Sequence, residues 1–186
     1  MSQLQCAFQK IHLESEVEKK DLNNWWGVVQ RVMEENRLNA YLKNLPKYQG
    51  SFALNELKDI EIKSFPNFFI INLANRIEQG THWIAVGVYQ NTVFVCDSLG
   101  GLIPDKQFPT QLINFLHVLT DNRKLFITKQ LQPLDSNKCG EYCILFVLEM
   151  SKTNSFRSFL SLFTNNLYQN DIIMSFLCNC SSTNKV

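Results

Sequence analysis

Residues 82–97 read His-Trp-Ile-Ala-Val-Gly-Val-Tyr-Gln-Asn-Thr-Val-Phe-Val-Cys-Asp, and this stretch decides the fold class. Two apolar runs, 82–89 and 92–97, are separated only by Gln90-Asn91, which predicts a tight hairpin between two strands. Further runs of strand length lie at 68–73 and 124–128. Runs as apolar as these are typical of strands buried on both faces, with helices packed over the sheet.

Helical patterns surround these strands along the chain. Apolar residues recur at three-to-four spacing in several segments, which are 12–35, 38–45, 109–120, 139 onward, 155–163 and 167–178. Residues 46–66, which contain Pro46, Gly50 and Pro66, are expected to form a loop. The sequence therefore predicts an α+β fold, in which helices flank a small central, mostly antiparallel sheet.

Length and composition set the broad class. The 186 residues predict a single domain over 1–186, with an N-terminal helical extension over 1–37 and a core over 38–186. Apolar content is 45%, which excludes disorder, and 18 Lys+Arg against 17 Asp+Glu give no reason to expect a nucleic-acid partner. Neither a membrane span nor a signal peptide is recognisable, so we expect an intracellular protein whose six cysteines are thiols.

Cys139 is the strongest candidate for a nucleophile. It is followed by Gly140 and opens a predicted helix, whose positive N-terminal end favours a thiolate. A nucleophilic thiol needs an imidazole to take its proton, and the imidazole needs an orienting acceptor. His82 and Asp97 lie at the open ends of the predicted hairpin strands, where they can meet across the ladder. Taken alone, His82 fits a histidine that caps a strand edge equally well.

Other chemically active side chains allow more than one interpretation. Gln132 fits an ordinary loop position, or a donor to an oxyanion beside the Cys139 N–H. Cys143 fits a buried small hydrophobe better than a metal ligand, because no Cys-x-x-Cys pair accompanies it, and no metal site is expected. Cys96 is expected to point into the core, and His117 to lie on the surface or core edge of its helix.

Several motifs combine into a family resemblance. They are His82-Trp83, Phe94-Val95-Cys96-Asp97-Ser98-Leu99-Gly100, and Gln132 followed after six residues by Cys139-Gly140-x-x-Cys143. Their order and spacing resemble the cysteine peptidase clan, unrelated to papain, that contains the adenovirus protease (adenain) and the SUMO-specific Ulp1-type proteases. Phe65-Pro66, residues 71–75 and 80–85, and the seven-residue step to Cys139 are adenain-like, whereas Asp97 with Ser-Leu-Gly resembles the Ulp1 type. Over about 38–178 the chain thus resembles divergent adenain-like proteases of viruses and virus-like DNA transposons.

The resemblance implies a role for each matching residue. Cys139 would be the nucleophile, His82 the base and later the acid, and Asp97 the group that orients the imidazole. Gln132 and the Cys139 amide would form the oxyanion hole. Cleavage would follow Gly-Gly or Gly-x-Gly, because a narrow channel admits only residues without side chains.

Two further residues belong to the implied substrate channel. Trp83 matches a residue that helps to close this channel in Ulp1-type enzymes, and it fits a core aromatic on a strand equally well. Gly140 lets backbone and substrate come close.

Protein substrates follow from the same resemblance. The leading hypothesis is a monomeric thiol peptidase that matures viral structural precursors in the host cell, in its nucleus, and in the virion. Three alternatives stay open: a deubiquitinase or deSUMOylase, an inactive domain that binds Gly-Gly tails or capsid protein, and an acyltransferase. The adenovirus enzyme is stimulated by a disulfide-linked peptide and by DNA. This chain has no cysteine over 124–132 and is nearly neutral, so no cofactor is expected.

Overall fold

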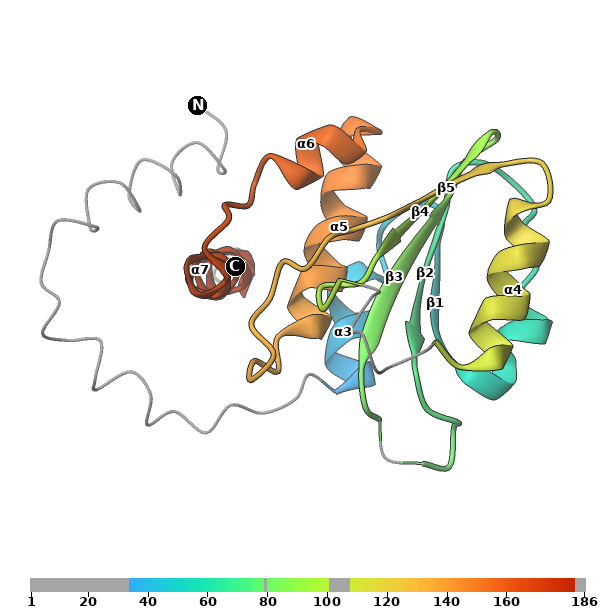
Figure 1. The fold of residues 1–186 in the computed structure, drawn as a ribbon, viewed down its shortest axis with the longest axis horizontal. Coiled ribbons are helices and arrows are strands. Elements are labelled where there is room, and N and C mark those ends of the chain that lie inside the picture. Colours follow the sequence, from blue (N-terminus) through green and yellow to red (C-terminus); the bar gives the residue numbers. More distant parts are fainter. Residues whose placement is uncertain (1–33, 79, 101–107, 183–186) are drawn as a thin grey trace, which may run out of the picture.

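The computed structural model describes residues 34–78, 80–100 and 108–182 (Figure 1). The helix expected over 12–35 lies outside this range except for its last two residues. Within the described residues, five strands form one sheet in the order β1-β2-β3-β4-β5. The strands are β1 (Tyr48–Ala53), β2 (Asn67–Asn72), β3 (Trp83–Val88), β4 (Thr92–Cys96) and β5 (Lys124–Ile127).

The three inner strands are antiparallel, as the hairpin pattern predicts. β3 pairs with both β2 and β4 in antiparallel register, and Val88 lies opposite Val93 at the hairpin end. The two outer strands run parallel to their neighbours, β1 to β2 and β5 to β4. The sheet is therefore mixed rather than mostly antiparallel, because each outer strand joins its neighbour through a helical crossover.

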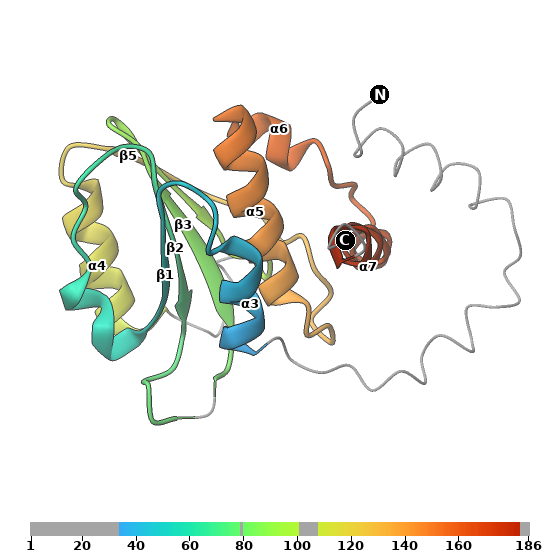
Figure 2. The same ribbon diagram turned by 180° about the vertical axis from the view of Figure 1, so that it is seen from behind.

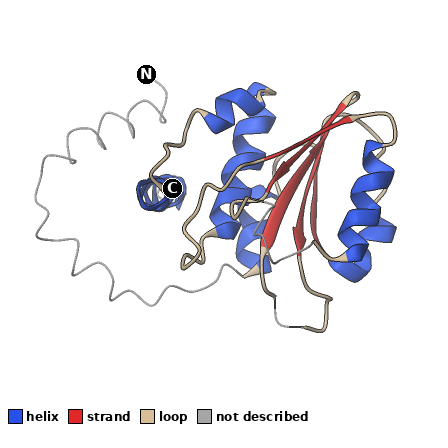
Figure 3. Ribbon diagram, in the orientation of Figure 1, coloured by secondary structure: helices blue, strands red, loops and turns tan. Residues whose placement is uncertain are grey.

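Helices cover both faces of the sheet (Figures 1 and 3). On one face lie α3 (Glu35–Leu42) and α5 (Cys139–Thr153), with α6 (Phe156–Leu160) and α7 (Leu167–Ser182) packed against α5. On the other face lie α4 (Thr110–Thr120) and the 3₁₀ helix η1 (Leu54–Asp59), as the reverse view also shows (Figure 2). Neighbouring residues of the inner strands alternate between two apolar cores, one under each helical layer.

The segment 46–66 is not the loop that the sequence predicts. It contains β1 and η1, which supply an edge strand and part of the cover of one face. The strand escaped detection because only Ala53 of its six residues is buried, so the apolar alternation typical of a strand is weak.

α5 is the central helix of the fold and carries the predicted nucleophile at its first residue. Ten of its fifteen residues are buried, and it packs across β3. It ends at Asn154, which adopts the left-handed conformation with φ of 52°. Because α5 is largely buried from Cys139 to Met150, its N-terminal turn is held in a fixed place at one end of the sheet.

Candidate active site

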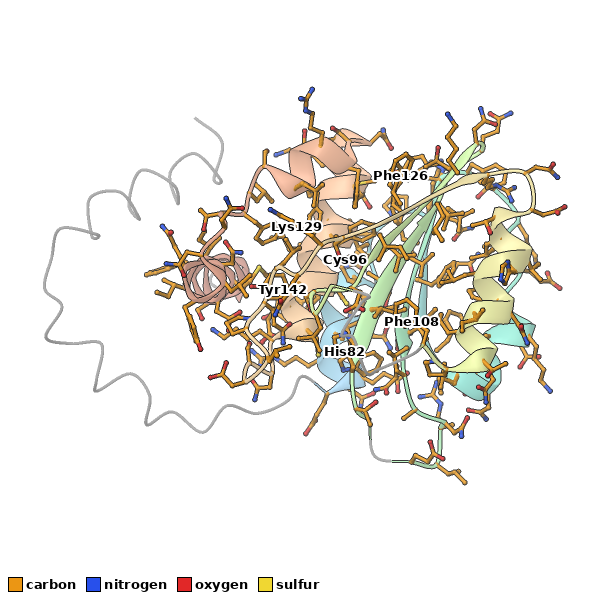
Figure 4. All side chains as sticks on the ribbon, in the orientation of Figure 1. His82, Cys96, Phe108, Phe126, Lys129 and Tyr142 are labelled. Atoms are coloured by element: carbon orange, nitrogen blue, oxygen red, sulfur yellow. The ribbon has the colours of Figure 1, made fainter. Side chains whose placement is uncertain are left out.

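The ends of β3 and β4 bring His82 and Asp97 into contact. His82 immediately precedes β3 and Asp97 immediately follows β4, so the antiparallel pairing places both at the same end of the hairpin. His82 Nε2 lies 2.8 Å from Asp97 Oδ1, and both side chains are largely buried. His82 is seen at this end of the sheet in Figure 4.

Cys139 completes the group from the N-terminus of α5. Its side chain is 5% exposed and forms a hydrogen bond with His82. Because Nε2 of the ring faces Asp97, Nδ1 is the nitrogen that faces the sulfur. Burial by itself would lower the pKa of His82, but hydrogen bonds and charge from Asp97 and Cys139 raise it to about 9. The imidazole is therefore protonated at neutral pH and places a positive charge beside the sulfur.

Asp97 is held in place by the turn that follows it and by Thr128. Its Oδ1 accepts a hydrogen bond from the Leu99 N–H at 2.9 Å. Its backbone N–H donates to Thr128 Oγ1 at 2.9 Å, and the Thr128 hydroxyl donates to the Asp97 carbonyl at 2.5 Å. These bonds fix the backbone of Asp97, so its carboxylate can hold the ring of His82 in one orientation.

Gly100 closes this turn and is required by its surroundings. Its φ is +91°, and its N–H donates to the Asp97 carbonyl at 2.9 Å. A Cβ here would lie 2.6 Å from the backbone nitrogen of Gln130, so both the conformation and the space exclude a side chain.

We expect Gly100→Ala to lower the free energy of unfolding by about 2–3 kcal/mol, measured by urea denaturation. Gly50→Ala is the matched control, because Gly50 also has a positive φ (129°) but nothing lies within 4 Å of its added Cβ. That control should cost only about 1 kcal/mol, the conformational part alone. Equal losses in the two variants would contradict the close approach to Gln130.

Gln132 is buried with its amide in a fixed orientation. The side chain is 1% exposed. Its Oε1 accepts a hydrogen bond from the Ser98 hydroxyl at 2.6 Å, and its Nε2 donates to the Ser136 carbonyl at 2.8 Å. Within the described residues, the second Nε2 hydrogen is not used by these bonds. It is the hydrogen that can be donated to an oxyanion, together with the backbone N–H of Cys139.

Gln132→Ala is expected to lower kcat by about 10²–10³-fold with little change in KM, because an oxyanion forms only in the transition state. Gln132→Glu should lose as much activity, since it keeps an acceptor for Ser98 but has no N–H to donate. The control is Gln111→Ala on the exposed surface of α4. A rise in KM with kcat unchanged would show that Gln132 only helps to bind the substrate.

The loop that carries Gln132 is anchored to α7. The carbonyl of Leu131 accepts a hydrogen bond from Asn170 Nδ2 at 2.9 Å, and Asn170 is fully buried. The Tyr142 hydroxyl, one turn after Cys139, lies 2.9 Å from Asp171 Oδ1 and 3.2 Å from the same Leu131 carbonyl. The loop and the first turn of α5 are thus tied to one helix.

Trp83 lies in the core and also borders a cleft, so it stays a candidate for the substrate channel. It is 5% exposed and belongs to the core between the sheet and α5. It also lines a cleft of about 310 Å³, next to His82. Gly140 is buried in the first turn of α5.

Cys96, Cys143 and His117 lie as expected. Cys96 and Cys143 are buried and form no disulfide, and burial raises the pKa of both well above the ordinary value of a thiol. Both are therefore neutral core residues. His117 is exposed on α4. Within the described residues, no three His, Cys, Asp or Glu side chains are grouped as ligands for a metal ion.

Sequence reasoning missed the residues that position the others. Thr128 follows β5, and the parallel register that places Val95 opposite Ile127 brings it beside Asp97. Ser98 lies within the Asp-Ser-Leu-Gly motif, but its contact with Gln132 joins segments 34 residues apart. A parallel β4–β5 pairing, had it been recognised from the intervening helix, would have pointed to Thr128.

Comparison with known proteins places the fold. No family model matches the chain, and no characterised protein matches it by sequence. By structure it is similar to HopZ1a, solved in complex with IP6, with a TM-score of 0.50 and 13% identity over 81% of this chain and 58% of that chain. Lower scores relate it to ChlaDub1 from Chlamydia trachomatis (TM-score 0.40, 18% identity, 63% of this chain and 60% of that chain). The SUMO protease Ulp1 gives a TM-score of 0.43 at 12% identity, over 97% of both chains.

The chain therefore spans about three fifths of the length of HopZ1a and ChlaDub1. At 13% identity, the HopZ1a likeness shows a shared fold. The helix-flanked, five-stranded mixed sheet shares the fold of HopZ1a, and the α+β class predicted from the sequence is confirmed. None of the helices in the described ranges is both long and apolar enough to cross a membrane.

Proposed function

We propose that this protein is a cysteine endopeptidase that cleaves after glycine, with Cys139 as its nucleophile. The observation that carries the proposal is the contact between Cys139, His82 and Asp97 at one end of the sheet, with the pKa of His82 raised to about 9. An imidazolium held between a carboxylate and a thiol at a helix N-terminus has the chemistry of an activated nucleophile.

Each step of peptide cleavage has a group to perform it. The Cys139 sulfur attacks the carbonyl carbon, and the resulting oxyanion accepts hydrogen bonds from Gln132 Nε2 and the Cys139 N–H. The peptide C–N bond then breaks as the protonated His82 gives its proton to the leaving amine. His82 next takes a proton from water, whose oxygen attacks the thioester; the C–S bond breaks, which releases the free acid and restores the thiolate beside the protonated imidazole.

The proposed substrates are viral structural precursor proteins with Gly-Gly or Gly-x-Gly sites. Support for this choice is the adenain-like sequence before His82 and the seven-residue step from Gln132 to Cys139. The enzyme would act as a monomer, in the nucleus of a host cell and in the virion. A deubiquitinase or deSUMOylase would use the same catalytic residues on Gly-Gly-tailed modifiers.

The test is labelling with a Gly-Gly peptide electrophile under reducing conditions, followed by intact mass and peptide mapping. One adduct on Cys139, strongly reduced in His82→Ala, is the expected result. A folded protein that gives no adduct, or one on Cys143, would contradict the proposal. Ubiquitin- and SUMO-based probes, compared with capsid-derived peptides, then separate the two substrate classes.

A further inference from the structure

A cleft next to the candidate catalytic residues has a chemical character that the proposed cleavage after glycine does not explain. Its volume is about 310 Å³, enough for a long side chain, and His82 and Trp83 form part of its wall. The other walls come from the start of α3, the end of β1, and the segment that joins β2 to β3. His82 therefore belongs both to the catalytic group and to this cleft.

The apolar part of the cleft comes from small and aromatic residues. These are Phe52, Ala53, Ala74 and Trp83. A side chain that entered here would lay methylene groups against this surface and leave a polar end toward solvent.

The charged part of the cleft is acidic. Glu34, Glu35 and Glu78 give three negative charges against the two positive charges of Arg76 and the protonated His82, a net charge of −1 for the lining. Hydrogen bonds from Asn75 hold the pKa of Glu78 below its ordinary value, so this carboxylate is ionised at neutral pH.

Arg76 does not offset this negative charge for a ligand, because it is already paired. Its Nη1 binds Glu35, while its Nε and Nη2 bind Glu56 at 2.7 and 2.5 Å. Glu35 also accepts a hydrogen bond from the Ser51 hydroxyl at 2.7 Å. Among the described lining residues, the cations are Arg76 and the protonated His82, which is paired with Asp97; Glu34 and Glu78 are not paired with Arg76.

We propose that this cleft binds a basic side chain of the substrate, lysine or arginine, close to the glycine that Cys139 attacks. The methylene stem of such a side chain fits the apolar wall, and its cationic end faces Glu34 and Glu78. The inference rests on the proposed peptidase function and adds a substrate preference to it. It predicts cleavage sites in which glycine is accompanied by a nearby basic residue.

The first test measures binding to the Cys139→Ala protein by fluorescence anisotropy at low ionic strength. The peptides contain Gly-Gly and carry lysine, norleucine or glutamate at one position, two to four residues on either side of the glycine pair. At one such position, lysine should bind about fivefold to tenfold more tightly than glutamate, with norleucine between them. The difference should shrink at high salt.

Charge reversal identifies the residues responsible. Glu34→Lys/Glu78→Lys should invert the order so that glutamate binds best, and Glu34→Gln/Glu78→Gln should remove most of the difference. Both side chains are exposed, so these variants are expected to fold. The matched control is Glu61→Lys, because Glu61 is exposed, lies outside the cleft and pairs with Lys63; the preference for lysine should persist there.

The failure of this inference can be told apart from the failure of the proposed function. If Gly-Gly electrophiles label Cys139 of the unaltered protein, but lysine and glutamate versions react at the same rate at every position, the basic preference alone is overturned. An order that does not change in the double lysine variant overturns it as well. If no Gly-Gly probe binds or reacts, the peptidase proposal fails and this inference fails with it.

Discussion

Cys139→Ala is expected to lower turnover of a Gly-Gly substrate by about 10⁴-fold or more, because the variant cannot form the thioester intermediate. Covalent labelling by a Gly-Gly electrophile should disappear with it. The free energy of unfolding should change by no more than about 1 kcal/mol, since the substitution removes only one sulfur atom from the Cys139 side chain, which is 5% exposed. Initial rates, intact mass and urea denaturation measure the three effects.

Cys143→Ala is the matched control, because Cys143 lies one turn further along the same helix and is buried and neutral. It should keep labelling and turnover, and it should cost about 1 kcal/mol of stability through the small cavity that it leaves. Turnover that survives in Cys139→Ala, or is lost in Cys143→Ala with the fold intact, would contradict the assignment of the nucleophile.

Asp97→Asn is expected to lower kcat/KM at neutral pH by about 10²-fold or more and to change the pH profile. Burial lowers the pKa of His82, and the bonds to Asp97 and Cys139 raise it to about 9. The alkaline limb of kcat/KM should therefore fall near pH 9 in the unaltered enzyme, as the imidazolium loses its proton. Without the carboxylate, the limb should move toward the ordinary histidine value of about 6.5.

The free energy of unfolding should also depend on the protonation of His82. A histidine with a higher pKa in the folded than in the unfolded chain stabilises the fold in its protonated form. That contribution is fully present below about pH 6.5 and is lost as the pH rises through about 9. Urea denaturation of Asp97→Asn should therefore show its largest deficit near pH 6 and a smaller one at about pH 10. Asp121→Asn, which is exposed beyond α4, is the control; a deficit independent of pH would argue against the His82–Asp97 pair.

The inner part of the fold could be predicted from the sequence because it is buried on both faces. β2, β3 and β4 are nearly continuous apolar runs, and α4 and α5 carry regular apolar spacing. β1 could not be found in this way, since five of its six residues are not buried. Whether an outer strand runs parallel or antiparallel to its neighbour depends on the connection between them. The apolar periodicity within a strand carries no information about this direction.

The sequence predicts those residues of the candidate site whose chemical type and order along the chain are distinctive. A thiol before a glycine, a histidine and an aspartate are recognisable from their order along the chain. The contacts of Thr128 and Ser98 are not, because threonine and serine are common and their role comes from the register of distant segments. The cleft was also missed, since its charges come from α3 and from the loop after β2.

The anchoring of the Gln132 loop by α7 has a consequence for protein synthesis. The Leu131 carbonyl is held by Asn170, which follows it by 39 residues and follows Cys139 by 31. A nascent chain emerges from its N-terminus, at about 5–20 residues per second. We expect His82, Asp97 and Cys139 to be present in the polypeptide on the ribosome before α7, the helix that anchors the Gln132 loop, has emerged. A growing copy would then lack the proposed peptidase activity until α7 has emerged.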